Sequence, residues 1–102
     1  MSKRFIVCFE NKNSNKDFDD NFIDYIKNNN LYWWHWISNL WLLIDPSNTL
    51  TASIIRDQIH QIFDTNRILV IELQEEKDTW SGYGPTKPKN MFDWMKKNWS
   101  NS

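Results

Sequence analysis

The sequence predicts an α+β domain in which two helices pack against a four-stranded antiparallel sheet. Four short apolar runs have the length and the β-branched or aromatic composition of strands, at residues 4–9, 31–37, 40–44 and 67–73. Two longer segments, 17–28 and 51–63, place apolar residues three or four positions apart, which is the period of an amphipathic helix. With 102 residues, the chain is expected to form a single domain spanning residues 1–102.

The first strand and the first helix follow each other at the N-terminus. The run RFIVCF is rich in strand-forming residues and ends in the polar stretch ENKNSNK, which is typical of a loop. In the next segment, Phe18, Phe22 and Ile26 recur every four residues, and Asp residues in the first turns suit the positive end of a helix dipole. We therefore expect a helix over 17–28 that ends at the sequence NNN.

A hairpin and a second helix follow. Only Ser38 and Asn39 separate the runs LYWWHWI and LWLLI, so a tight turn is the simplest connection. The sequence DPSN ends the second of these strands, because proline lacks a backbone donor and Asp, Ser and Asn favour turns and helix caps. One face of the second helix is apolar, through Ile55, Ile59, Ile62 and Phe63. The run RILVIEL is the fourth strand.

The resulting β-α-β-β-α-β order predicts a ferredoxin-like sandwich, in which both helices cover one face of the sheet. A sheet covered on one side should alternate apolar and polar residues. Here both phases are apolar, as the first strand illustrates with Phe5, Ile6, Val7, Cys8 and Phe9. The second face of the sheet must therefore also be covered.

Two candidates can cover this second face. One is a C-terminal helix, since Met91, Phe92, Met95 and Trp99 form an apolar stripe at helical spacing. We accordingly expect residues 85–102 to be a helical extension of the domain. The other candidate is a second copy of the chain, and the sequence leaves both open.

Composition excludes several classes of protein. Twelve Lys and Arg residues against thirteen Asp and Glu give a net charge of −1, which lacks the wholesale basicity of a protein that coats nucleic acid. No apolar run approaches the roughly 18 residues of a membrane span, and the start MSKRFIVCFE lacks the apolar core of a secretion signal. We therefore expect a cytoplasmic protein with no membrane partner. One cysteine permits neither an internal disulfide nor a cysteine-rich zinc site.

Several motifs together carry a resemblance to a known family. They are RFIVCFE, WWHWISNLWLL, IRDQI, ILVIEL, WSGYG and FDWMKK, and they run from the first strand to the tail. The chain resembles the SinR-like family of small ferredoxin-like proteins, which are relatives of the small subunit of the CRISPR adaptation integrase and of VapD-type endoribonuclease toxins. The resemblance implies a homodimer built around the sheet.

The resemblance also implies a metal site in the relatives that are nucleases. An acid at the end of their first strand helps to hold a divalent metal at the dimer axis, and Glu10 has that position here. Magnesium or manganese would be the cofactor of such an enzyme, and otherwise we expect no cofactor. The relatives usually carry Asp, and the longer Glu side chain moves the carboxylate, which near-octahedral magnesium sites tolerate poorly.

Two side chains are candidates for catalysis. Glu10 could be a metal ligand or a general base at a strand end beside a loop, or simply a solvated acid. His35 lies among the tryptophans of the hairpin, where a neutral imidazole could act as a general base or stack on a ligand. A His in a hairpin strand is more often a partly buried packing residue.

The tryptophan cluster is a candidate binding platform, because aromatic rings displayed on a sheet can stack bases. Its members are Trp33, Trp34, Trp36 and Trp41. Such platforms normally lie in a basic groove, yet no Lys or Arg occurs between Lys27 and Arg56. Burial in the core and in a dimer or tail interface is the simpler explanation of these rings.

The cationic residues cluster near the C-terminus instead. Lys87 and Lys89 precede the predicted terminal helix, and Lys96 and Lys97 lie within it. They are either phosphate contacts or a solvated face near the negative end of a helix.

Three functional hypotheses follow. The leading one is a non-catalytic, homodimeric interaction or regulatory module, with a possible protein partner, of the kind linked to mobile elements, toxin–antitoxin pairs or defence systems. The second is a metal-dependent nuclease resembling the relatives, with Glu10 as a ligand. The third is a binder of single-stranded nucleic acid or a nucleotide that uses the Trp-rich hairpin.

Overall fold

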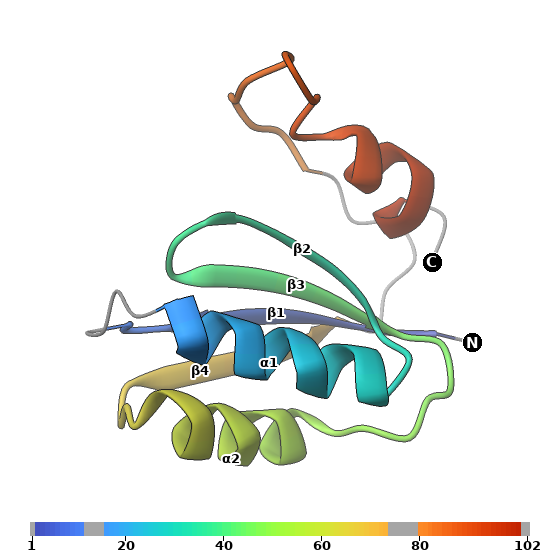
Figure 1. The fold of residues 1–102 in the computed structure, drawn as a ribbon. Coiled ribbons are helices and arrows are strands. Elements are labelled where there is room, and N and C mark those ends of the chain that lie inside the picture. The colour runs from blue at the N-terminus through green and yellow to red at the C-terminus, as the bar shows by residue number, and fades with distance from the viewer. Residues whose placement is uncertain (1, 12–15, 74–79, 101–102) are drawn as a thin grey trace.

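The structure, a computed structural model, describes residues 2–11, 16–73 and 80–100. Two helices lie side by side on one face of a four-stranded sheet (Figure 1). The strands are β1 (Lys3–Phe9), β2 (Tyr32–Ile37), β3 (Leu40–Asp45) and β4 (Ile68–Leu73), and the helices are α1 (Lys16–Asn28) and α2 (Ala52–Phe63). The predicted α+β class and its two helices are confirmed, with element ends within one or two residues of those expected.

The strands lie in the order β2-β3-β1-β4, and every neighbouring pair is antiparallel. This order is compatible with a ferredoxin-like arrangement. The hairpin turns at Ser38 and Asn39 as expected, and the β2–β3 register shifts between Trp34 and Ile37. The two edges of the sheet are therefore β2 and β4.

The main core lies between the helices and the inner face of the sheet, defined as the face that the helices cover. Trp41 of β3 is fully buried there and meets Phe22 of α1 edge to face, with ring centroids 4.8 Å apart. The predicted apolar helix faces supply the other side of this core, through Phe22, Ile26, Ile55, Ile59 and Phe63. One phase of each central strand points inward, and the other phase points to the outer face.

A buried carboxylate organises the loop between β3 and α2. Asp45 is 1% exposed and ends β3. Its carboxylate accepts the backbone N–H of Ser47 at 3.1 Å and those of Thr49 and Leu50 at 2.8 Å each. Burial, and then the negative charge of Asp45, raise the pKa of the Tyr25 phenol above its ordinary value. The sequence indicated a turn here but not a buried charge at its centre.

The C-terminal tail (residues 80–100) lies on the outer face of the sheet, away from α1 and α2 (Figure 1). Its helix is shorter than the stripe predicted: helical residues begin at Asp93 and end in a π-helical turn, η1 (Met95–Trp99). The Asn90 Oδ1 atom accepts the Phe92 N–H at 2.9 Å, so Asn90 caps a turn at Met91 and Phe92 that leads into the helix. Residues 101–102 of the predicted extension lie outside the described residues.

Across the described ranges, no helix combines the length and the apolar character that crossing a membrane would require.

Candidate interaction surface

The outer face of the sheet is divided into a covered half and an open half. The tail covers the β2–β3 side, where tail and sheet form a second buried cluster of Trp34, Leu42, Ile44, Met91, Met95 and Trp99. The Trp34 Nε1 atom donates a hydrogen bond to the Met91 carbonyl at 2.8 Å. Beside it, the Arg4 guanidinium lies 5.3 Å from the centre of the Trp99 ring, within the range of a cation–π contact. The predicted cover by the C-terminal segment is therefore present over part of this face.

The remainder of the outer face is apolar and accessible. We name this open patch by its five residues, Cys8, Ile37, Leu40, Leu69 and Ile71. Cys8 pairs with Leu40 on one side and with Leu69 on the other, so these side chains form one row across the sheet. Leu69 is 60% exposed and Ile71 is 42% exposed, and their position in one contiguous apolar patch is what makes this exposure informative.

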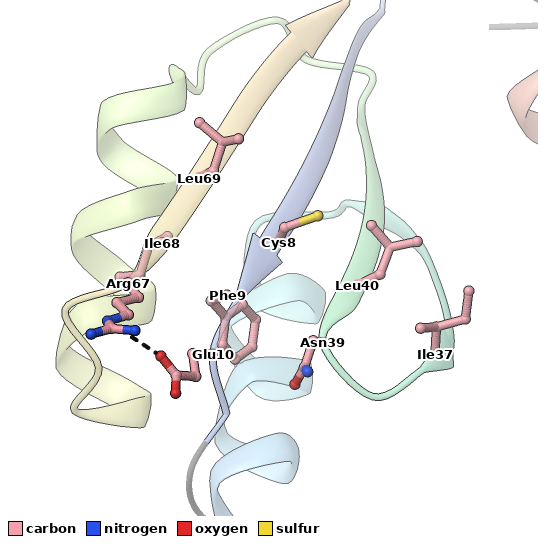
Figure 2. A pocket seen from close by; sticks show the side chains of 9 residues that line it. All are labelled: Cys8, Phe9, Glu10, Ile37, Asn39, Leu40, Arg67, Ile68 and Leu69. Carbon is pink, nitrogen blue, oxygen red and sulfur yellow. Dashed lines mark ion pairs between the residues drawn. The ribbon is translucent and has the colours of Figure 1, made fainter.

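A shallow, widely open groove of about 650 Å³ lies along this row (Figure 2). Its walls come from β1, β4 and the β2–β3 hairpin, through Cys8, Phe9, Glu10, Ile37, Asn39, Leu40, Arg67, Ile68 and Leu69. The polar groups of the groove gather at one end, as the figure shows. The groove therefore offers an apolar floor with one polar rim.

An ion pair forms this polar rim. The Arg67 Nε atom lies 3.5 Å from Glu10 Oε2, and both side chains are substantially exposed. Backbone pairing holds the two residues side by side, since the Glu10 N–H donates to the Arg67 carbonyl at 3.0 Å. Asn39 also lines this end of the groove, and its Oδ1 atom accepts the backbone N–H of Asn11 at 3.4 Å. The carboxylate predicted as a metal ligand is thus paired with a cation that the sequence analysis did not single out.

His35 lies on the other face of the sheet from Glu10. Its ring stacks on Trp41 of the inner core, with centroids 3.7 Å apart and an angle of 3° between the planes. Its Nδ1 atom lies 2.9 Å from the Leu40 carbonyl, which makes Nδ1 the donor of that hydrogen bond. The fold does not bring the two predicted catalytic residues together.

The four predicted hairpin tryptophans separate into different environments. Trp41 is fully buried in the inner core, and Trp33 packs against it, with ring centroids 5.9 Å apart. Trp34 is buried under the tail and stacks on Phe92. Trp36 alone of the four is exposed, at 40%. The four rings therefore do not present a common face to solvent.

The predicted cations of the tail lie in exposed positions. Lys87 and Lys89 belong to a stretch, residues 81–89, that is exposed throughout. Neither is a lining residue of the groove. The two lysines and the polar rim are thus separate surface features.

Within the described part of the chain, no three His, Cys, Asp or Glu side chains come together as a metal site would require. The lining of the groove contains one acid, Glu10.

Comparisons with known proteins give no match: no protein-family model, no curated protein and no solved structure matches the chain. The resemblance to SinR-like proteins and the functions that it implies stay predictions.

Proposed function

We propose that this chain is a non-catalytic homodimeric interaction module with a ferredoxin-like fold, and that a second copy covers the open patch. The observation that supports the proposal is the unequal cover of the outer face. The tail buries one half of that face, whereas the described residues (2–11, 16–73 and 80–100) leave the large side chains Ile37, Leu69 and Ile71 next to it exposed. Large apolar side chains that form a contiguous exposed patch commonly mark a protein interface.

The open patch has the composition of an interface. Its centre is aliphatic, and its charged groups, Glu10 and Arg67, lie at the rim. An interface of standard size takes about 800 Å² from each partner. The patch would supply the centre of such an area, and the groove residues around it would supply the edge. A two-fold dimer needs one such surface, because the same patch serves both subunits.

A pair of matched substitutions tests the proposal. Ile71 of the open patch and Ile54 of α2 are both isoleucines with nearly equal exposure, 42% and 46%. We expect light scattering coupled to size exclusion to give a dimer mass for the unmodified chain at tens of micromolar. Ile71→Asp should give the mass of one chain, and Ile54→Asp should stay dimeric. Leu69→Lys provides a second disruption of the patch, and circular dichroism checks that each variant is folded.

Cys8 gives an independent measurement, because it is the one cysteine of the chain and lies in the floor of the groove. In the dimer its thiol is covered, so the rate of alkylation by a maleimide should fall as the protein concentration rises. In the Ile71→Asp variant the rate should not depend on concentration. A dimer in which Cys8 reacts as fast as in the monomer would show that the subunits meet elsewhere.

The resemblance of the sequence motifs extends the proposal to a biological setting. We propose a link to mobile elements, toxin–antitoxin pairs or defence systems, with a further protein as the possible partner of the dimer. Pull-down of products encoded beside this gene by the purified dimer, but not by Ile71→Asp, tests whether dimerisation and partner binding are connected.

A further inference from the structure

Beyond the open patch itself, the ion pair at its rim has a geometry that constrains how two copies can meet. This inference rests on the homodimer proposed above. We propose that, in this dimer, Glu10 of each subunit faces Arg67 of the other, so that the two pairs form a ring of four alternating charges. The partner is a second copy of this chain, and the ionic rim sets the direction of the two-fold axis.

The register of the sheet gives the positions that must match. Glu10 directly follows β1, two residues after Cys8, and Arg67 directly precedes β4, two residues before Leu69, so the alternation of side chains puts both on the outer side of the sheet, where they line the groove. Cys8 and Leu69 are lateral neighbours in the sheet, as are Glu10 and Arg67. An apolar row and an ionic row therefore run parallel to each other across β1 and β4.

A two-fold axis across the strands does not satisfy these rows. If the axis passes through the row of Cys8, a residue that lies two positions from Cys8 along a strand faces the residue of the partner's same strand that lies two positions from Cys8 in the opposite direction. Glu10 then falls on Ile6 of the partner, and Arg67 falls on Ile71 of the partner, so charges lose water against aliphatic side chains without a counter-charge. If the axis passes through the ionic row, Glu10 meets Glu10 and like charges face each other.

An axis parallel to the strands and midway between β1 and β4 satisfies both rows. Each residue then faces its own lateral neighbour in the partner: Cys8 faces Leu69, and Glu10 faces Arg67. Two sheets that pack face to face keep their strands nearly aligned, which this axis allows. It places the second copy over Cys8, Leu69 and Ile71, at the end of β1 and β4 away from Ile6 and Leu73, which pack against the tail cluster. Ile37 and Leu40, which lie on β2 and β3, then border the interface.

The single-chain pair leaves room for this exchange. The Nε–Oε2 distance of 3.5 Å is long for a charge-assisted hydrogen bond, and 81% of the Arg67 side chain is exposed. Both groups can therefore turn toward a second copy with little loss of interaction free energy between them. In the ring, each charge has two opposite neighbours instead of one, and partial removal of water strengthens all four contacts.

Charge reversal tests the exchange. Glu10→Arg alone places four positive charges in the ring, and Arg67→Glu alone places four negative charges there. We expect each variant to weaken its own dimer at least tenfold at low salt. An equimolar mixture should form the heterodimer with an affinity within a few-fold of the unmodified chain, because each charge again faces an opposite charge across the interface, while the like charges within each subunit are the same in the free variants. Native mass spectrometry separates the three dimers by mass, and size exclusion with light scattering gives the affinities.

Salt provides the control for electrostatics, since about 1 M salt shortens the screening length to about 3 Å. The preference for the heterodimer should shrink accordingly. The double variant Glu10→Gln with Arg67→Gln adds no repulsion, and its dimer should lose the salt dependence of the unmodified dimer while keeping the fold.

The outcomes separate this inference from the proposed function. If both reversal variants dimerise as well as the unmodified chain, and their mixture gives the statistical half of heterodimer, the charge exchange is overturned. The dimer through the open patch still stands in that case, provided that Ile71→Asp is monomeric. If the unmodified chain is monomeric at every concentration, both proposals are overturned.

Discussion

Replacing Asp45 by alanine should be among the most damaging single changes in this chain. The carboxylate is 1% exposed and accepts three backbone N–H groups, at 3.1, 2.8 and 2.8 Å. Hydrogen bonds to a charged group contribute about 1.5–3 kcal/mol each, and a buried donor left without an acceptor costs about 1–3 kcal/mol. The desolvation of the carboxylate, which the variant avoids, offsets part of that sum. We expect a net loss of about 3–5 kcal/mol.

This loss is large against the stability of a small domain, which is about 5–15 kcal/mol. For a chain of this length, 1 kcal/mol corresponds to a change in Tm of about 4–8 °C, so a loss of about 3–5 kcal/mol in Asp45→Ala should lower Tm by roughly 12–40 °C. Thermal melts and urea unfolding, followed by circular dichroism, measure the change. Asp20→Ala, at an exposed position of α1, is the matched control for loss of one acid. It should leave the free energy of unfolding within about 0.5 kcal/mol.

Asp45→Asn separates shape from hydrogen bonding. The amide keeps the size of the carboxylate and one acceptor oxygen, which can serve the two N–H groups at 2.8 Å, but its NH₂ group meets the third donor. We expect a loss of about 1–3 kcal/mol, between those of the control and of Asp45→Ala. If Asp45→Ala and Asp20→Ala unfold at the same urea concentration, the carboxylate does not hold this loop and the reasoning fails.

Three further changes have definite expected outcomes. Trp34→Phe removes the hydrogen bond to the tail and should cost about 1–3 kcal/mol, with faster amide exchange across the tail as the specific readout. Trp41→Ala should lower the free energy of unfolding by about 3–5 kcal/mol because the ring is fully buried. Trp36→Ala, at an exposed ring, should leave Tm nearly unchanged. A stable Trp41→Ala variant with reduced oligonucleotide binding would favour a stacking platform instead. The raised pKa of Tyr25 favours its neutral form in the folded state, so stability should fall as pH rises above about 10, where the unfolded chain ionises first. Tyr25→Phe should flatten that fall in pH-dependent urea unfolding, and an unchanged slope would contradict the assignment.

The elements of the fold could be predicted because the periodicity of the sequence is strong. Phe18, Phe22 and Ile26 lie four residues apart, and in the structure Phe22 and Ile26 are fully buried while Phe18 packs at the edge of the same core. The N-terminal end of the terminal helix could not be predicted in the same way. The apolar spacing extends back to Met91, but Met91 and Phe92 form a turn capped by Asn90, and apolar periodicity alone does not distinguish such a turn from the first turn of a helix.

The interaction surface was harder to predict, because it depends on which strands are neighbours. Apolar residues in both phases indicated that the outer face is covered, but an apolar phase does not distinguish cover by the tail from cover by a second chain. The Glu10–Arg67 pair required knowing that the end of β1 meets the start of β4. The ferredoxin-like order implied this pairing, so the signal was present although neither spacing nor composition shows it.

The proposed dimer accounts for the distribution of charge over β1 and β4. On the outer face of these two strands, ionic groups lie only at the ends, with Arg4 at one end and the Glu10–Arg67 pair at the other. Arg4 is buried under the tail beside Trp99, so the chain itself closes that end. The other end combines an apolar row with an exposed ionic rim, which is the anatomy of a protein interface. In the proposed dimer, the lateral pairing of Glu10 with Arg67 gives each of these charges an opposite charge to face in a second copy related by an axis along the strands.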